Sequence, residues 1–301
     1  MKKALIVITV LLIVGAVAGV TGSVIYAAND GVMKDAEKKS VNLDYSGEDL
    51  SIETDFDKIE VEVIDGNQIT FDYYESEKVK RTIENEEGEI SFETESPHFF
   101  NWFIGNKYVL KIGVPQDFGG KLEIESETGS VVVDLNKVTC KEINVEVTTG
   151  NLTIKNATCT DDFSLETTTG SIIAENIAAG VSAKVEVTTG NLELRNLSAK
   201  DVKIKMTTGS LKKGEINCQS FSAEATTGSL SFSLSGATKI YLKATTGEVR
   251  GKIAGIEKDF NVETSTTTGK SNLRNQTVVG SDKSVVAKTT TGNINIEFIG
   301  E

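Results

Sequence analysis

A Thr-Gly pair that recurs about every 20 residues constrains this chain more than any other feature. The glycine of the pair occurs nine times at spacings of 19 to 23 residues, and eight of the nine pairs read Thr-Thr-Gly. The nine glycines are Gly129, Gly150, Gly170, Gly190, Gly209, Gly228, Gly247, Gly269 and Gly292. A fixed period of this length is typical of architectures in which each repeat stacks on the one before it.

Apolar and polar side chains alternate on both sides of each glycine. The segment 143–147, which precedes Gly150, reads Ile-Asn-Val-Glu-Val, and Leu152 and Ile154 continue the alternation after the bend. A period of two is the pattern of a strand with one buried face. Each repeat is therefore predicted to be a strand, a Thr-Gly bend, a second strand and a return turn.

Every repeat shows the same signature at the same position, which favours parallel stacking over a series of antiparallel hairpins. In a parallel stack each coil lies about 4.8 Å above the last, so that equal residues form columns. The glycines, in one column, permit the positive φ or tight bend that other residues resist. Asn156, Asn176 and Asn196, each six residues after a glycine, predict a short asparagine ladder.

The three cysteines follow the repeat. Cys140 and Cys218 precede the next repeat glycine by ten residues, and Cys159 precedes its own by eleven. Small residues hold the same place in other coils, namely Gly180, Ala199 and Ala237. This pattern predicts a tight interior corner with buried thiols; the alternative is a Cys140–Cys159 disulfide between adjacent coils, which an exported location would permit. Three isolated cysteines and one histidine predict no metal site.

The N-terminus indicates export. Lys2 and Lys3 precede an uncharged and mostly aliphatic segment, residues 4–29, which is long enough to cross a bilayer as a helix. The positive-inside rule then places everything after Asp30 outside the cytoplasm. We expect residues 1–29 to be a single-pass anchor in the cell membrane and 30–40 to be a polar tether. The alternative is a cleaved signal peptide and a secreted protein.

The negative charge of the chain is concentrated in one segment. Residues 41–115 contain 18 acidic and 6 basic side chains, a net charge of −12, whereas the whole chain has −13. Short alternating runs predict that this segment is an acidic β cap on a solenoid formed by 116–301, because an uncovered first coil would expose an edge. The charge makes nucleic acid a poor partner and favours cationic ones.

An aromatic stretch interrupts the predicted cap at residues 96–104. Its distinctive side chains are His98, Phe99, Phe100, Trp102 and Phe103. Such a loop would either dock on a membrane or protein partner, or plug the open end of the core. His98 by itself supports no catalytic triad.

A column of glutamates is the strongest argument for catalysis, because some parallel β-solenoids cleave polysaccharides. Glutamate occurs four residues before several repeat glycines, at Glu125, Glu146, Glu166, Glu186 and Glu224, and lysine replaces it at Lys205 and Lys243. We interpret the column as a solvated face, since coils this short lack the long loops that carry most enzyme sites. No catalytic residue, metal or cofactor is predicted.

The order of these features resembles a known family, the adhesin-like DUF4097 domains of bacteria, which include LiaG-like and YvlB-like membrane proteins. The resemblance rests on a strand at 52–54, a second at 59–63, a third ending in Val114-Pro115, and the serial Thr-Gly coils, and it covers about 41–299. It implies an envelope β-solenoid with a link to envelope-stress operons of Gram-positive bacteria. It brings no catalytic residues.

The sequence thus predicts an all-β protein, a single-stranded parallel β-solenoid of about nine coils with an N-terminal β cap, preceded by one transmembrane helix. The expected function is a binding or scaffold role at the bacterial cell envelope, with a protein, peptide or glycan as ligand. An extracytoplasmic component of an envelope-stress response is the alternative, and a polysaccharide-active enzyme is a further one.

Overall fold

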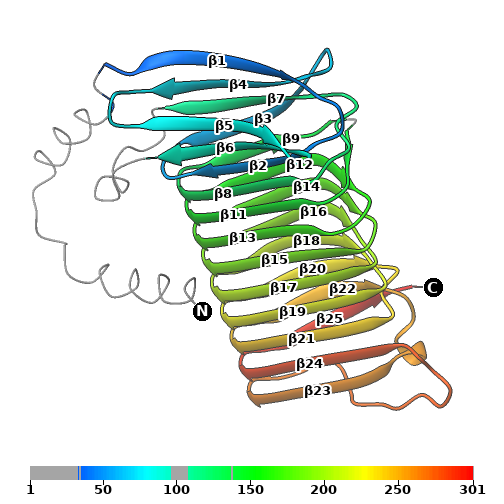
Figure 1. The fold of residues 1–301 in the computed structure, drawn as a ribbon. Coiled ribbons are helices and arrows are strands. Elements are labelled where there is room, and N and C mark those ends of the chain that lie inside the picture. The colour runs from blue at the N-terminus through cyan, green and yellow to red at the C-terminus, as the bar shows by residue number, and fades with distance from the viewer. Residues whose placement is uncertain (1–32, 34, 96–107, 137, 301) are drawn as a thin grey trace, which may run out of the picture.

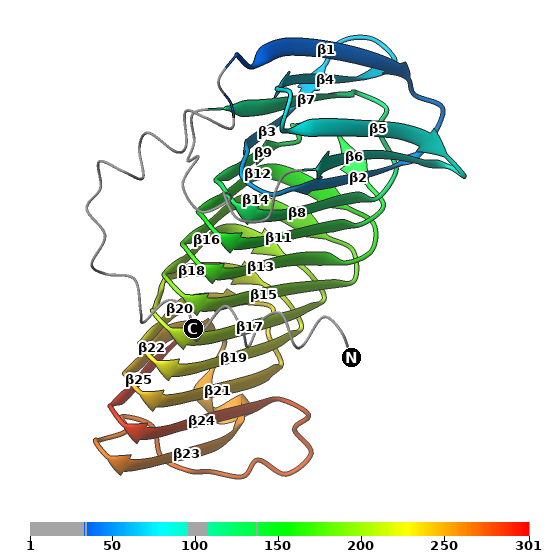
Figure 2. The same ribbon diagram turned by 60° about the vertical axis from the view of Figure 1, so that its left-hand side comes forward.

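The structure, a computed structural model, describes residues 33, 35–95, 108–136 and 138–300. The anchor predicted at 1–29 and the aromatic stretch at 98–103 lie outside these residues, so both stay predictions. Within the described part of the chain there is no helix long and apolar enough to cross a membrane. Figure 1 and Figure 2 show an elongated stack in which two sheets, A and B, run side by side from one end to the other.

The alternating segments form strands, as predicted. In spatial order, sheet A contains β1 (Glu37–Asp44), β4 (Gln68–Glu75), β7 (Val109–Pro115), β3 (Lys58–Ile64), β9 (Val131–Asp134), β12 (Leu152–Cys159), β14 (Ile172–Ala179), β16 (Leu192–Ser198), β18 (Leu211–Asn217), β20 (Leu230–Ser235), β22 (Val249–Ala254) and β25 (Ile294–Ile299), with β10 (Thr139–Cys140) beside β12. Sheet B contains β23 (Asn261–Thr268), β24 (Ser284–Thr291), β21 (Lys239–Thr246), β19 (Ser220–Thr227), β17 (Asp201–Thr208), β15 (Ser182–Thr189), β13 (Phe163–Thr169), β11 (Ile143–Thr149), β8 (Leu122–Thr128), β2 (Asp49–Thr54), β6 (Glu89–Glu95) and β5 (Lys80–Glu86). A short 3-10 turn, η2 (Glu257–Asp259), follows β22.

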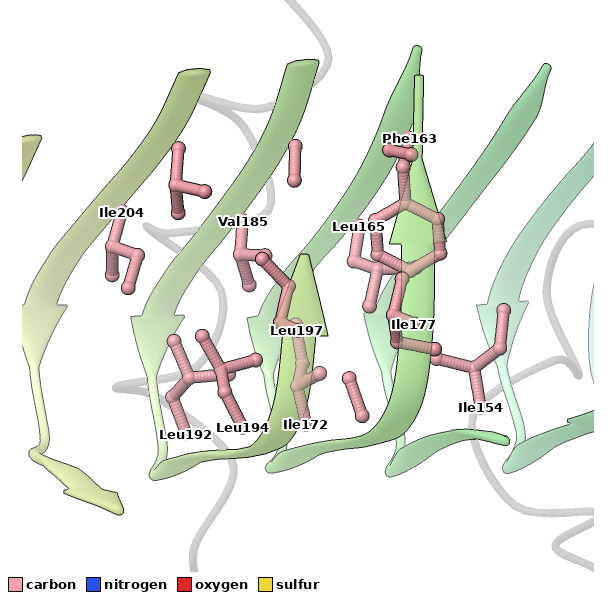
Figure 3. Close-up of a cluster of buried hydrophobic side chains, with 14 of the residues drawn as sticks. Ile154, Phe163, Leu165, Ile172, Ile177, Val185, Leu192, Leu194, Leu197 and Ile204 are labelled. Carbon is pink, nitrogen blue, oxygen red and sulfur yellow. The ribbon is translucent and has the colours of Figure 1, made fainter. Parts of the chain in front are cut away.

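Parallel, in-register stacking of the repeats is confirmed. Each regular coil places one strand in sheet B and, after its glycine bend, the next strand in sheet A. Val145 of β11 pairs with Leu165 of β13, which pairs with Val185 of β15. Figure 3 shows Leu165, Val185 and Ile204 of sheet B on the inner side of the stack, together with apolar side chains of sheet A such as Ile154 and Leu194. The core is therefore a continuous apolar column between the two sheets.

The spatial order of the coils departs from chain order at the C-terminal end. The last repeat strand, β24, pairs directly with β21, and β23 packs on the far side of β24. Gly269 consequently lies outside Gly292 in the glycine column, and the chain between them loops around the end of the stack. Asn272 in this loop covers the edge of β25, because its side chain donates to the Ile296 carbonyl and accepts from the Ile296 N–H.

Parallel stacking also begins before residue 116. Strands β2 and β3 pair in parallel with β8 and β9, and β6 and β7 form a further coil outside them. The antiparallel pairs of the N-terminal end are β1 with β4, β4 with β7, and β5 with β6. The predicted cap, 41–115, thus contains two irregular coils. The repeat pattern did not predict them, because the bend at 55–57 reads Asp-Phe-Asp in place of Thr-Thr-Gly.

The repeat glycines fix the bends for two separate reasons. Their φ angles lie between +135° and +153°. Residues that carry a Cβ rarely adopt φ angles in this range. In addition, a Cβ at Gly170 would overlap the carbonyl oxygen of Gly150 in the neighbouring coil, and the same holds for Gly190 over Gly170. The glycine column therefore sets how closely successive coils approach.

The asparagine ladder is confirmed. Asn156, Asn176 and Asn196 have φ angles of 51°, 56° and 57°, in the left-handed region that asparagine tolerates. The Asn176 Nδ2 donates to Asn156 Oδ1, and the Asn196 Nδ2 donates to Asn176 Oδ1, both at 3.1 Å. The Asn156 Nδ2 donates to Asp134 Oδ1 at 3.0 Å, so the ladder ends on a carboxylate.

The cysteine column is also present, with one correction. Cys140 pairs with Cys159 in adjacent coils, and Cys159 pairs with Ala179, so Ala179 and not Gly180 occupies this place. All three thiols are free and buried, and the alternative Cys140–Cys159 disulfide is not formed. Burial raises the pKa of Cys140 and Cys218 to about 12, and burial with the nearby Asp162 and Asp161 raises the pKa of Cys159 to about 11.

We expect Gly190→Ala to destabilise the domain by roughly 3 kcal/mol, because it adds backbone strain to a steric overlap. Gly280 is a matched control, since its φ is +81° but a Cβ there would meet no atom within 4 Å. Gly280→Ala should therefore cost only about 1 kcal/mol. Urea unfolding followed by circular dichroism measures both, and equal losses would show that close approach of the coils does not matter.

We expect the native thiols to react with a disulfide reagent at pH 8 roughly 100-fold more slowly than the thiols of the unfolded chain, because the thiolate is the reactive form. The absorbance of the released chromophore measures the rate, and the same protein in concentrated urea is the control. Rapid modification of the native protein would contradict the buried corner.

Candidate binding surface on the outer face of sheet B

The outward side chains of sheet A neutralise one another locally. On this surface Arg195 of β16 lies 2.9 Å from Glu193 and 3.6 Å from Glu175 of β14. Lys252 of β22 likewise lies 3.7 Å from Glu297 of β25. Because acids and bases are neighbours both along and across the strands, this face presents little net field to a partner.

The outward side chains of sheet B are arranged differently. Glu146 of β11 is in register with Glu166 of β13 and Glu186 of β15, and on the other side with Glu125 of β8. The structure confirms the predicted column and extends it to Glu53 and Glu93, giving the continuous series Glu93, Glu53, Glu125, Glu146, Glu166 and Glu186. We call this series the acidic column.

The sequence did not predict the two added glutamates, because the residues beside them in the sheet are distant in the chain. Glu53 lies 72 residues from Glu125 in sequence, yet the two are paired in adjacent strands. A signal was present: Ile52-Glu53-Thr54 repeats the polarity pattern of Ile124-Glu125-Ser126. Without a Thr-Gly bend, however, nothing in the sequence assigned that segment to a coil.

Repulsion and partial burial act on the middle of the acidic column. Burial raises the pKa of Glu166, and the charges of Glu186 and Glu146 raise it further. Lys184 partly offsets this effect and contacts Glu186 at 3.3 Å. The column therefore concentrates negative charge that the chain itself balances only in part.

Lysines continue the same column toward the C-terminal end. Glu186 pairs with Lys205 of β17, and beyond Glu224 of β19 come Lys243 of β21 and Lys288 of β24. Lys203 and Lys239 lie on the same outward face. We call the five side chains Lys203, Lys205, Lys239, Lys243 and Lys288 the basic half. One face of one sheet is thus acidic at its N-terminal end and basic at its C-terminal end.

A buried ion pair closes the N-terminal end of the core. Arg81 of β5 has a fully buried side chain, and Asp57 is 2% exposed. The Arg81 Nη2 donates to Asp57 Oδ1 at 2.9 Å, and its Nη1 lies 2.8 Å from Oδ2. Arg81 also donates to Thr94 and to the Tyr74 carbonyl, and its guanidinium lies over the ring of Phe56.

The charges of this pair are held at an energetic cost. Burial raises the pKa of Asp57 to about 6, although the positive charge of Arg81 opposes the rise. Sequence reasoning missed the pair, because Arg81 follows Lys78 and Lys80 in what reads as a solvated, charged strand. Its role is structural, since both side chains are buried and bind each other.

The C-terminal end has a shallow hollow of about 480 Å³. Ile256, Leu273 and Phe298 supply apolar surface there, while Asn272 and Glu297 make its wall largely polar. The Phe298 ring packs against Phe260 at 5.2 Å between centroids. The titratable side chains of the hollow are Glu257 and Glu297, and Glu297 lies 3.7 Å from Lys252.

No group of three or more His, Cys, Asp or Glu side chains suited to a metal ion occurs among the described residues. His98, Phe99, Phe100, Trp102 and Phe103 lie in the sequence between β6 and β7, outside the described residues, so their predicted role as a partner loop or plug is still a prediction. The surface that remains as a candidate is the polarised face of sheet B.

The fold and this face define a parallel β-solenoid with one charge-polarised outer face. The family model of Toastrack DUF4097 matches residues 42–297, and the chain belongs to that family. The comparison with curated proteins gave no match.

Solved structures with related folds share little sequence with this chain. One is named a putative adhesin from Bacteroides fragilis NCTC 9343, with 15% identity, a TM-score of 0.46, and coverage of 86% of this chain and 97% of that one. Another is named a putative lipid binding protein from Parabacteroides distasonis ATCC 8503, with 15% identity, a TM-score of 0.46, and coverage of 87% and 97%.

We expect Asp57→Asn to lower the free energy of unfolding by about 3–5 kcal/mol, because it leaves the Arg81 charge buried and unpaired. Adding Arg81→Met should recover most of that loss, since the double variant buries no charge. Urea unfolding of both variants at pH 7 measures the coupling. Additive losses would show that the two side chains do not act as a pair.

Proposed function

We propose that this protein is a non-catalytic, adhesin-like binding scaffold at the bacterial cell envelope. The observation that carries the proposal is the polarised outer face of sheet B, where charges of one sign are stacked in register on a rigid frame. Complementary potentials of this kind steer encounters and select partners. The partner of the acidic column would be a cationic segment of a protein or peptide, or a cationic group on a glycan.

The geometry of the acidic column favours binding over hydrolysis. Its carboxylates stand at even spacing on the open outer face of a sheet, whereas a glycosidase flanks its scissile bond with two carboxyl groups in a site that can hold the sugar. The three buried thiols have raised pKa values and are poor nucleophiles. We therefore infer that the face recognises a partner without altering it.

Membrane attachment through the N-terminal segment is part of the proposal. Strand β1 begins at Glu37, inside the segment predicted to be the tether, and it lies at the opposite end of the stack from β23 (Figure 1). An anchored chain would hold the acidic column nearer its attachment and the basic half farther from it. A role as the extracytoplasmic part of an envelope-stress response would use the same face to bind its signal.

The test is binding of a fluorescent octalysine peptide to the full-length protein in a neutral detergent, measured by anisotropy at about 30 mM and about 500 mM NaCl. We expect binding at low salt that weakens at least about tenfold at high salt, because both partners are charged. Glu146→Gln with Glu166→Gln should weaken binding by a similar factor. Glu175→Gln with Glu193→Gln, on sheet A, is the matched control and should leave it unchanged.

Equal effects of the two double variants would contradict the assignment to sheet B. Release of reducing sugar ends from cell-wall glycan, lost in the Glu146→Gln and Glu166→Gln variant, would contradict the non-catalytic role and revive the polysaccharide-active alternative.

A further inference from the structure

We propose that the outer face of sheet B is also the contact surface for a second copy of this chain, in an antiparallel, face-to-face pair. The inference deepens the proposed function by naming a partner. It starts from the fact that the acidic column and the basic half lie on one face of one sheet, end to end.

The basic half is only partly neutralised within its own chain. Lys288 lies 2.7 Å from Glu263 of β23, but Lys205 and Lys243 form no ion pair with any other described residue. Lys205 is exposed on β17, and Lys243 is exposed on β21. These two ammonium groups are therefore available to a carboxylate from outside.

A two-fold axis parallel to the strands makes this face complementary to itself. Such an axis reverses the direction of the solenoid, so that the acidic column of one copy covers the basic half of the other, and contacts occur twice. With the axis between β15 and β17, Glu186 faces Lys205 of the second copy and Glu146 faces Lys243. These oppositions follow from the order of the strands alone.

The same arrangement contains two like-charged oppositions, Glu166 with Glu224 of the second copy and Lys184 with Lys203 of the second copy. Glu166 already has a raised pKa because of burial and its glutamate neighbours. These oppositions offset part of what the opposite-charged contacts contribute. A pair with both solenoids in the same direction would instead oppose the acidic columns along their whole length, which is costly.

The face is large enough for a specific pair. The eight strands from β8 to β24 span about 34 Å at about 4.8 Å per strand, and seven residues of strand span about 23 Å. The face thus offers roughly 800 Å² per copy, which is the usual contribution of one partner to a stable interface. Because it is polar and charged, its strength should depend steeply on salt.

Antiparallel pairing has a consequence for where the two copies are anchored. It places the N-terminal ends at opposite ends of the pair, so two chains held by the predicted N-terminal anchor would bridge two facing membranes. Copies in one membrane would have to fold one tether back along the whole solenoid. The geometry therefore points to homotypic contact between surfaces.

The test is sedimentation velocity of the full-length protein in density-matched detergent, with two charge-reversed variants. One variant carries Glu146→Lys and Glu186→Lys, and the other carries Lys205→Glu and Lys243→Glu. Alone, each should self-associate at least about tenfold more weakly than the wild type, because like charges now face each other. Mixed in equal amounts, they should form a heterodimer, since every altered contact is again between opposite charges.

The control variant reverses two charges on sheet A, Glu175→Lys and Glu193→Lys, and should associate as the wild type does. Association that ignores the sheet B variants, for example through the apolar N-terminal segment, would overturn the proposal. So would a wild type that stays monomeric at about 30 mM NaCl together with a mixture that does not pair. If octalysine still binds in that case, the binding role stands and only the homotypic partner is wrong.

Discussion

The close approach of backbone to backbone at the repeat glycines is the contact on which the rest of this structure depends. At Gly150, Gly170 and Gly190 the neighbouring coil occupies the space where any other residue would carry its Cβ. Positive φ angles at the same positions turn the chain from sheet B to sheet A. Every coil is thereby held at one height and in one register, and a shift of a single residue would exchange the inner and outer side chains.

In-register stacking converts a one-dimensional pattern of residues into surfaces. Glu146, Glu166 and Glu186 are twenty residues apart in the chain but adjacent in sheet B. The same stacking places lysines and glutamates side by side on sheet A, where they neutralise one another. This contrast in charge between the outer faces makes sheet B the candidate site. It arises from the residue types that successive coils carry at the same position of the repeat.

The regular coils, their register, the asparagine ladder and the central acidic column could be predicted, because each depends on a short pattern repeated at a fixed distance from a glycine. The coil formed by β2 and β3 could not, since the bend at Asp55–Asp57 does not contain the Thr-Gly pair. The Arg81–Asp57 pair also left no signal, because it joins two segments that become neighbours only through the irregular order of the N-terminal strands. The position of β23 was hidden for the same reason.

The placement of β24 between β21 and β23 bears on how the chain reaches its final state. Successive repeats up to β22 can zip onto the growing stack in the order in which a ribosome produces them. Strand β23 cannot, because its place is on the far side of a strand that is made later. The C-terminal end of the stack can therefore form only after β24 has been synthesised. Strand β23, made earlier, then pairs with β24 as the outermost strand of sheet B.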